Sequence, residues 1–86
     1  MKFKQECVLR EVAGEHIVIP VVGLENQFKG IMTLNETAVF IWKQIEKEKE
    51  KEEIVAALLE EYDVEKEQAV RNVDNFCEQL EKLGIL

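Results

Sequence analysis

The sequence predicts an α+β fold in which three short strands are followed by three helices, in the order βββααα. Val and Ile are abundant in the first third of the chain and are interrupted by turn residues, a pattern typical of short strands. After Met32, apolar residues recur every three or four positions, which is the period of an amphipathic helix. A chain of 86 residues suits one small domain, so residues 1–86 are expected to form a single domain.

The strands are expected at Cys7–Val12, His16–Val22 and Phe28–Met32. Ala13-Gly14 offers a turn between the first two strands, and the short connections favour an antiparallel meander. Pro20 has no N–H to donate, so the second strand must either lie at a sheet edge there or end at that point.

The first helix is expected to begin close to the third strand. Thr33 and Glu36 match a capping box, in which a hydroxyl and a carboxylate satisfy N–H groups of the first turn. Asn35 is a second possible cap. Apolar side chains at helical spacing predict the buried stripe of this helix: Leu34, Ala38, Ile41, Trp42 and Ile45.

A run of charged residues, Glu46–Glu53, separates the first helix from a second one. At about 100° per residue, the second apolar stripe lies roughly 110° away from the first. One continuous helix could not bury both stripes against one core, so a break is expected near residues 47–51. The second stripe comprises Ile54, Val55, Leu58, Leu59 and Tyr62.

The third helix is expected to follow Asp63, whose side chain can cap it. Gly84 is placed to end this helix in a left-handed turn, and Ile85-Leu86 would then fold back on the core. The predicted buried stripe is Ala69, Val73, Phe76, Cys77, Leu80 and Leu83.

The composition disfavours several classes of function. The chain has 18 acidic and 11 basic residues and a net charge of −7, so nucleic acid is not an expected partner. No apolar run is long enough to span a membrane, and the N-terminal residues lack the apolar region of a signal peptide. No membrane partner and a cytoplasmic location are therefore expected.

No catalytic or metal-binding pattern is present in the sequence. The chain contains no serine, and its glycines do not have the spacing of a phosphate-binding loop. His16 is the single histidine and lies in an apolar strand, which favours a structural or partly exposed role. Cys7 and Cys77 are expected to be reduced, buried thiols, since nothing in their spacing favours a disulfide or a zinc site. The sequence indicates a binding module without a cofactor or metal, and not an enzyme.

The third strand is the candidate binding element. Gly30 leaves a bare patch where another backbone could approach closely, and an edge strand can accept an added strand. The alternative is that Gly30 marks a bulge and that Phe28 and Ile31 only pack in the core. The third helix offers the other wall of a groove, with Asn72 and Gln79 beside its buried stripe.

Several motifs resemble the PqqD-like family, named for pyrroloquinoline quinone biosynthesis protein D. Leu34-Asn35-Glu36-Thr37 followed by Ile41-Trp42 is similar to the start of the first helix in that family. The later motifs Tyr62-Asp63-Val64, Val73-x-x-Phe76-x-x-x-Leu80 and Leu83-Gly84-Ile85-Leu86 follow in the family's order. The similarity extends from about Val8 to the end of the chain.

The resemblance implies a winged-helix-like arrangement that recognises ribosomally made, post-translationally modified peptides. Such domains bind the leader segment of a precursor peptide as an added strand and present it to a modifying enzyme, often a radical S-adenosylmethionine enzyme. By position, the groove lies between the third strand and the third helix and would use Phe28, Lys29, Gly30, Ile31, Met32, Asn72, Phe76 and Gln79.

The chain departs from the family pattern at two places. Asn72 stands where the family commonly has Asp, and Glu46–Lys51 replaces a short turn between the first two helices. Two other functions stay open: a winged-helix DNA-binding regulator, and an assembly subunit whose strand pairs with its own copy. A monomer or a weak homodimer is expected.

Overall fold

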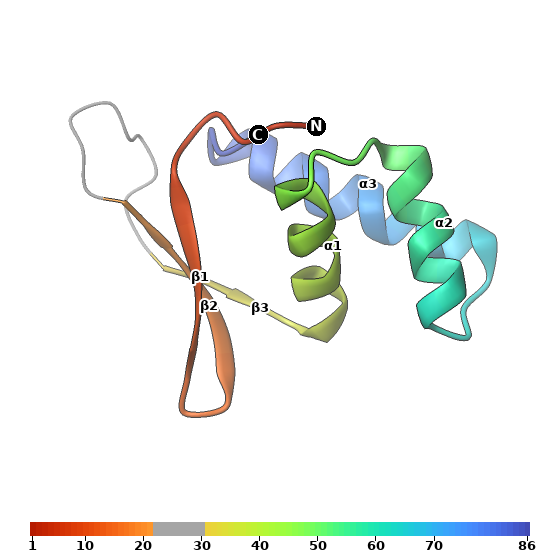
Figure 1. Cartoon of the computed structure of the whole chain (residues 1–86), viewed down its shortest axis with the longest axis horizontal. Helices are drawn as coiled ribbons and strands as arrows, with labels where there is room; N and C mark the ends of the chain where they lie inside the picture. Colours follow the sequence, from red (N-terminus) through yellow and green to blue (C-terminus); the bar gives the residue numbers. More distant parts are fainter. Residues whose placement is uncertain (22–30) are drawn as a thin grey trace.

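The computed structural model describes residues 1–21 and 31–86, and its elements have the predicted order (Figure 1). The sheet lies at one end of the molecule and the helices lie at the other. The predicted α+β fold with βββααα order is confirmed. The elements are β1 (Cys7–Val12), β2 (Glu15–Pro20), β3 (Met32–Leu34), α1 (Glu36–Glu46), α2 (Lys51–Glu61) and α3 (Lys66–Lys82).

The described strands form the antiparallel meander that the turn residues predict, in the order β1-β2-β3. Ala13 and Gly14 connect β1 to β2, and their φ angles of 51° and 81° are both left-handed. This combination is the type I′ turn, whose twist matches that of the flanking strands. β2 is the central strand of this sheet, and β3 lies at its edge.

Two predicted strand boundaries need correction. β2 ends at Pro20, so Val21 lies outside the strand, and Val22 lies outside the described residues. β3 begins at Met32, where the prediction ended its third strand, and Ile31 precedes it. The predicted residues 28–30 lie outside the described part of the chain.

β3 occupies residues that were predicted to begin the first helix. Leu34 pairs with His16, and Met32 pairs with Val18, so the two alternate positions of β3 face the same side of the sheet. Leu34 and Val18 are buried, whereas Thr33 between them is exposed. The pairing with β2 therefore places Leu34 in the core as a strand residue.

The predicted Thr33–Glu36 capping box is wrong, because Thr33 lies within β3. The alternative cap is confirmed: Asn35 is the N-cap of α1, and its Oδ1 accepts a hydrogen bond from the Ala38 N–H at 2.8 Å. This bond satisfies one of the N–H groups that the first turn leaves free. Asn35 thus fixes the point at which the sheet edge becomes a helix.

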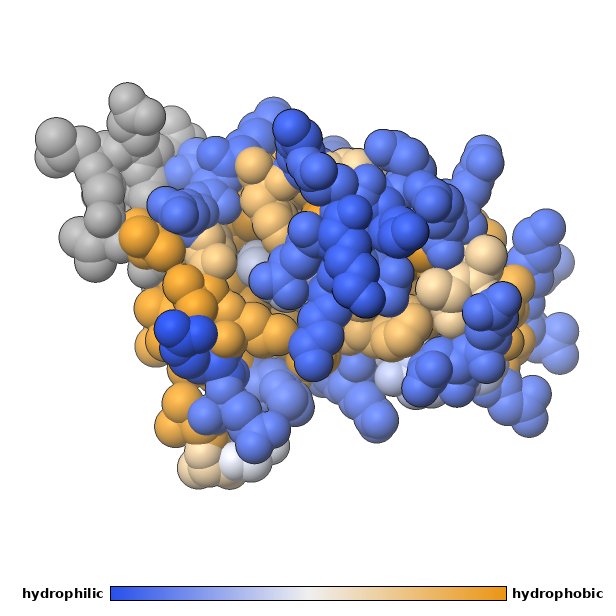
Figure 2. Space-filling view, viewed as in Figure 1, coloured by the Kyte–Doolittle hydropathy of each residue, from blue (hydrophilic) through white to orange (hydrophobic). Residues whose placement is uncertain are grey.

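The predicted break between the first two helices is confirmed. α1 ends at Glu46 and α2 begins at Lys51, and Glu48 in the turn has a left-handed φ of 60°. The predicted Asp63 cap is wrong, because α3 starts two residues later than that cap requires and Glu65 is its N-cap. On the face seen in Figure 2, hydrophilic side chains cover much of the helices, and hydrophobic side chains gather over the strands.

The core is centred on Trp42, which is 0% exposed and packs among residues from all three helices and from the sheet. Gly84 has a left-handed φ of 76°, as expected for the end of α3. The chain then turns back, so Ile85 is fully buried. The Lys4 N–H donates to the Ile85 carbonyl at 2.7 Å, which joins the two ends of the chain (Figure 1).

Candidate functional site

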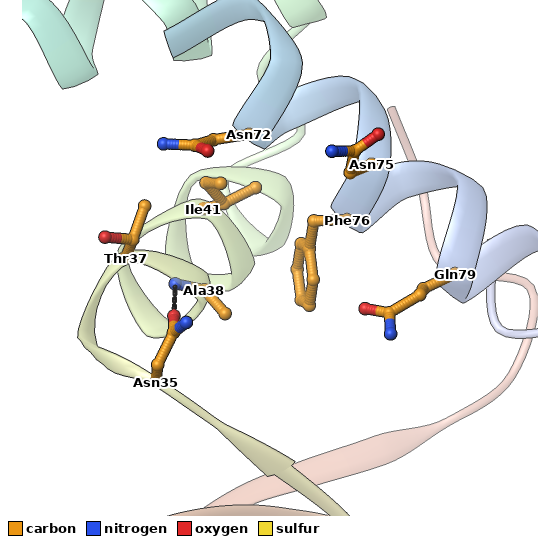
Figure 3. Close-up of a pocket in the computed structure, with 8 residues that line it drawn as sticks. All are labelled: Asn35, Thr37, Ala38, Ile41, Asn72, Asn75, Phe76 and Gln79. Carbon is orange, nitrogen blue, oxygen red and sulfur yellow. Dashed lines mark hydrogen bonds between the residues drawn. The ribbon is translucent and has the colours of Figure 1, made fainter. Parts of the chain in front are cut away.

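A cavity of about 240 Å³ opens between the start of α1 and the middle of α3 (Figure 3). None of the described side chains that line it is ionisable, although the chain carries a net charge of −7. The cavity therefore offers hydrogen bonds and apolar contact without a fixed charge. Its lining residues are Asn35, Thr37, Ala38, Ile41, Asn72, Asn75, Phe76 and Gln79.

The α3 wall is built by helical spacing. Asn72, Phe76 and Gln79 lie four and three residues apart, so they share one face of the helix. Phe76 is 6% exposed and belongs to the core, so its ring forms an apolar floor. Figure 3 shows this ring pointing from α3 into the space beside α1, with the Gln79 amide on one side of it and Ala38 on the other.

The α1 wall begins directly at the sheet edge. Asn35 follows the last residue of β3, and Thr37 and Ala38 form the first turn of α1. Among the described residues β3 is paired only with β2, so its other edge has N–H and C=O groups turned away from the sheet. An extended chain added along that edge would pass next to the cavity.

Polar side chains on α3 are connected to the cavity by hydrogen bonds. Gln68 Nε2 donates to Asn72 Oδ1 at 2.8 Å, and Arg71 Nη2 donates to Gln68 Oε1 at 2.8 Å. Gln68 and Arg71 do not line the cavity themselves, whereas Asn72 does. The three side chains form one chain of hydrogen bonds that ends at the cavity wall.

Residues 15–86 match the family model of coenzyme PQQ synthesis protein D (PqqD). The chain belongs to the PqqD family. The resemblance stated from the motifs around Leu34–Thr37 and Leu83–Leu86 is therefore confirmed. The comparison with curated proteins gave no match.

Two solved structures are similar to this PqqD-family chain over nearly their whole length. TbiB1 in complex with the TbiA(beta) leader peptide has a TM-score of 0.77 and 26% sequence identity, covering 99% of this chain and 94% of that chain. Lasso peptide synthetase B1 complexed with the leader peptide has a TM-score of 0.75 and 19% sequence identity, covering 96% of this chain and 92% of that chain. The second likeness shows the fold alone.

In this PqqD-family chain the structure brings three of the predicted site residues together: Asn72, Phe76 and Gln79 all line the cavity. Met32 lies in β3 and packs against the core instead, and Ile31 beside it is 66% exposed. The remaining predicted residues, Phe28, Lys29 and Gly30, lie outside the described part of the chain.

Sequence reasoning missed several lining residues of the cavity. Asn75 could have been found, because it lies three residues after Asn72 and so shares that face of α3. Thr37 and Ala38 carry no such signal, since only the packing of α1 against α3 brings them to the cavity. Asn35 was identified only as a cap.

None of the described histidine and cysteine side chains lines this cavity. The His16 side chain is 36% exposed, and its Nε2 lies 3.5 Å from Glu11 Oε2. Cys7 and Cys77 are free thiols, and burial raises the pKa of each above its ordinary value.

Residues 1–21 and 31–86 contain no group of His, Cys, Asp and Glu side chains that could hold a metal ion. No helix among them has the length and apolar character needed to cross a membrane.

A second hollow lies on another side of α3, against α2, and is lined by apolar side chains such as Val55, Leu59 and Val70. Its lining comes from α2 and α3 only, so it is not continuous with the edge of β3. Lys51 and Asp74 also line it, and they form an ion pair at 3.2 Å. Of these two hollows, the cavity between α1 and α3 is the one that includes Asn35, the residue that follows β3.

Proposed function

We propose that this chain is a non-catalytic peptide-binding protein that captures the leader segment of a ribosomally made precursor peptide. The leader adds as a strand to the edge of β3 and is presented to a modifying enzyme, of the radical S-adenosylmethionine class in this proposal. Residues 1–86 act as one recognition domain in the cytoplasm, where precursor peptides are synthesised.

The observation that carries this proposal is the position of an uncharged cavity beside an edge strand. Backbone hydrogen bonds along β3 would supply affinity that is independent of peptide sequence, and a cavity for one side chain would supply selectivity. Asn35 joins the two features, because it ends β3 and lines the cavity. The TbiB1 relative, which has this fold, is itself bound to a leader peptide.

The proposed binding residues are those predicted from the sequence. The segment Phe28–Met32 would contact the peptide backbone, and Asn72, Phe76 and Gln79 would contact a side chain of the peptide. Asn35, Thr37 and Asn75 join the second group because they line the same cavity.

The charge of α3 supports this proposal over DNA binding. Within the helix, Lys66, Arg71 and Lys82 are outnumbered by the acidic residues Glu67, Asp74, Glu78 and Glu81. Lys82 is also paired with Glu78 at 3.5 Å, so it is not an unpaired cation available to a phosphate. A winged-helix regulator that reads DNA through α3 would need the opposite balance.

The test uses ¹⁵N-labelled protein titrated with synthetic peptides covering the short reading frames next to its gene. Binding as proposed shifts amide signals in residues 31–35 and in the cavity face of α3. Gln79→Ala should weaken binding about threefold or more, because it removes a polar wall of the cavity. Glu78→Ala, at an exposed neighbouring position, is the matched control and should bind as the unchanged protein does.

Three outcomes would contradict the proposal. Peptides that leave the signals of β3 and α3 unchanged would exclude this groove. A dimer that forms with rising concentration and excludes peptide would favour strand pairing between two copies. A modifying enzyme that processes the precursor equally fast with and without this protein would remove the presenting role.

A further inference from the structure

The orientation of two amide groups in the cavity is fixed by groups that can only donate hydrogen bonds. An asparagine amide has an oxygen that can accept two hydrogen bonds and an NH₂ group that can donate two, so a hydrogen bond to the oxygen leaves the NH₂ end with more free positions for a ligand. The orientation of such an amide therefore determines which ligand groups it can bind. Asn35 and Asn72 are the two amides in question.

Asn35 is oriented by the backbone of α1. The Ala38 N–H can only donate, so the Asn35 oxygen must face it, as the dashed line in Figure 3 shows. The NH₂ group of Asn35 is then left to the cavity side. The cap that starts α1 thus also provides a hydrogen-bond donor to the cavity.

Asn72 is oriented by a relay that begins at Arg71. A guanidinium group can only donate, so the atom of Gln68 that it contacts at 2.8 Å must be the oxygen Oε1. The other end of Gln68 is therefore its NH₂ group, which donates to Asn72 Oδ1 at 2.8 Å. One lone pair of the Asn72 oxygen is then used by Gln68, whereas both N–H bonds of the Asn72 NH₂ group are left for a ligand.

We propose that these two amides make the cavity selective for a peptide side chain that accepts hydrogen bonds, a carboxylate or an amide carbonyl, and disfavour lysine and arginine side chains. This inference rests on the proposed function and names the side-chain chemistry of the peptide. Arg71 is a positioning residue, because it acts on the ligand only through Gln68 and Asn72. None of the described residues that line the cavity is a carboxylate, so they offer a cationic side chain no opposite charge.

The relay is tested first in the free protein by the NMR signals of the Asn72 side-chain NH₂ group. Arg71→Glu should invert the relay, because a carboxylate accepts from Gln68 and turns the Gln68 oxygen toward Asn72. The Asn72 NH₂ signals should then shift, while Arg71→Lys, which keeps a donor, should leave them in place. Lys66→Glu makes the same charge change at another exposed position of α3 and is the control.

Selectivity is tested with the peptide that binds in the titration above, replacing each position in turn by Glu, Gln or Lys. At one position, Glu or Gln should bind about fivefold or more tightly than Lys, which is typical of gaining hydrogen bonds and leaving none unsatisfied. Glu and Gln distinguish a carboxylate from an amide carbonyl as the preferred group. Asn72→Asp, which replaces the donor by an acceptor, should reverse the preference toward Lys.

The outcomes separate this inference from the function on which it rests. Unchanged Asn72 signals in Arg71→Glu would overturn the relay whether or not any peptide binds. Equal binding of Glu, Gln and Lys at every position would overturn the selectivity while peptide capture stands. The preference for Glu or Gln over Lys is also measured in Arg71→Glu and Lys66→Glu. If both variants lose it equally, the preference depends on the overall charge of α3, which would contradict the relay. If the protein binds none of the peptides, the proposed function is overturned, and so is the proposal that the cavity takes a peptide side chain.

Discussion

The ring of Phe3 stacks on the ring of Trp42, with centroids 4.2 Å apart and an interplanar angle of 29°. Trp42 is the largest fully buried side chain of the core, and Phe3 covers it from the N-terminal segment. The backbone of the next residue, Lys4, is bonded to Ile85 after the end of α3. The two chain ends therefore close the core together, beside the helices that form the cavity.

Phe3→Ala should lower the free energy of unfolding by about 2 kcal/mol, measured by urea denaturation. Removing a fully buried Phe costs roughly 3–5 kcal/mol, and Phe3 is only half-buried. Phe3→Leu is the control, since it keeps apolar cover over Trp42 and should cost less than the alanine variant. A loss below about 0.5 kcal/mol in Phe3→Ala would show that the stack contributes little.

Asn35→Ala should destabilise the protein by about 1 kcal/mol, because the Ala38 N–H loses its side-chain acceptor. Asn35→Ser, which keeps an oxygen at the cap, should lose less than half of that amount in the same denaturation measurement. Thr33→Ala tests the rejected capping box, and a loss of helix content in this variant would contradict the assignment of the cap to Asn35.

The predicted residues that lie together in the structure are those whose positions follow from local periodicity. Asn72, Phe76 and Gln79 share a helix face by spacing alone, and the sequence could therefore place them on one wall. The opposite wall was not predictable, because Thr37 reaches the cavity only through the packing of α1 against α3. Leu34 was assigned to a helix because its apolar spacing fits one, but its pairing with His16 holds it in a strand.

The position of the N-terminal segment was likewise not predictable from local sequence patterns. A single aromatic residue in the polar stretch Met1–Glu6 has no period, so nothing local predicts that Phe3 enters the core. The start of α3 was also misplaced, since Asp63 is a good cap by residue type but Glu65 occupies that position. Which residue becomes the N-cap depends on where tertiary packing starts the helix, and more than one polar residue before α3 could have been the cap.

Ala13→Asn should raise the free energy of unfolding by about 0.5–1 kcal/mol. Ala13 has a φ of 51°, which its side chain disfavours, whereas Asn tolerates this region and Asn-Gly is preferred in type I′ turns. Thermal and urea denaturation of the two proteins give the comparison. Gly14→Ala is the opposite control and should lower the free energy of unfolding. Because no neighbour would clash with the added carbon, this decrease reports the strain of an alanine at a φ of 81° alone. A less stable Ala13→Asn variant would contradict the turn assignment.

Stability should fall as the pH rises from about 8 to 9.5, because of the two thiols. Burial raises the pKa of Cys77 and of Cys7, so the folded protein keeps these protons at pH values where the unfolded chain, with thiols of pKa about 8.5, releases them. The unfolded state then binds fewer protons than the native state, and stability decreases with pH. The stability that the two protonated thiols contribute is fully present below about pH 8 and is lost as the pH rises toward their pKa values in the folded protein.

The measurement is the urea midpoint of unfolding at half-unit steps of pH. A variant carrying Cys7→Ala and Cys77→Ala should be less stable at neutral pH, since it leaves a cavity, but its midpoint should change less between pH 8 and 9.5. Lys51 does not confuse this window, because its hydrogen bond to Asp74 raises its pKa further above that of an ordinary lysine. Midpoints that fall equally in both proteins would assign the pH dependence to groups other than the thiols.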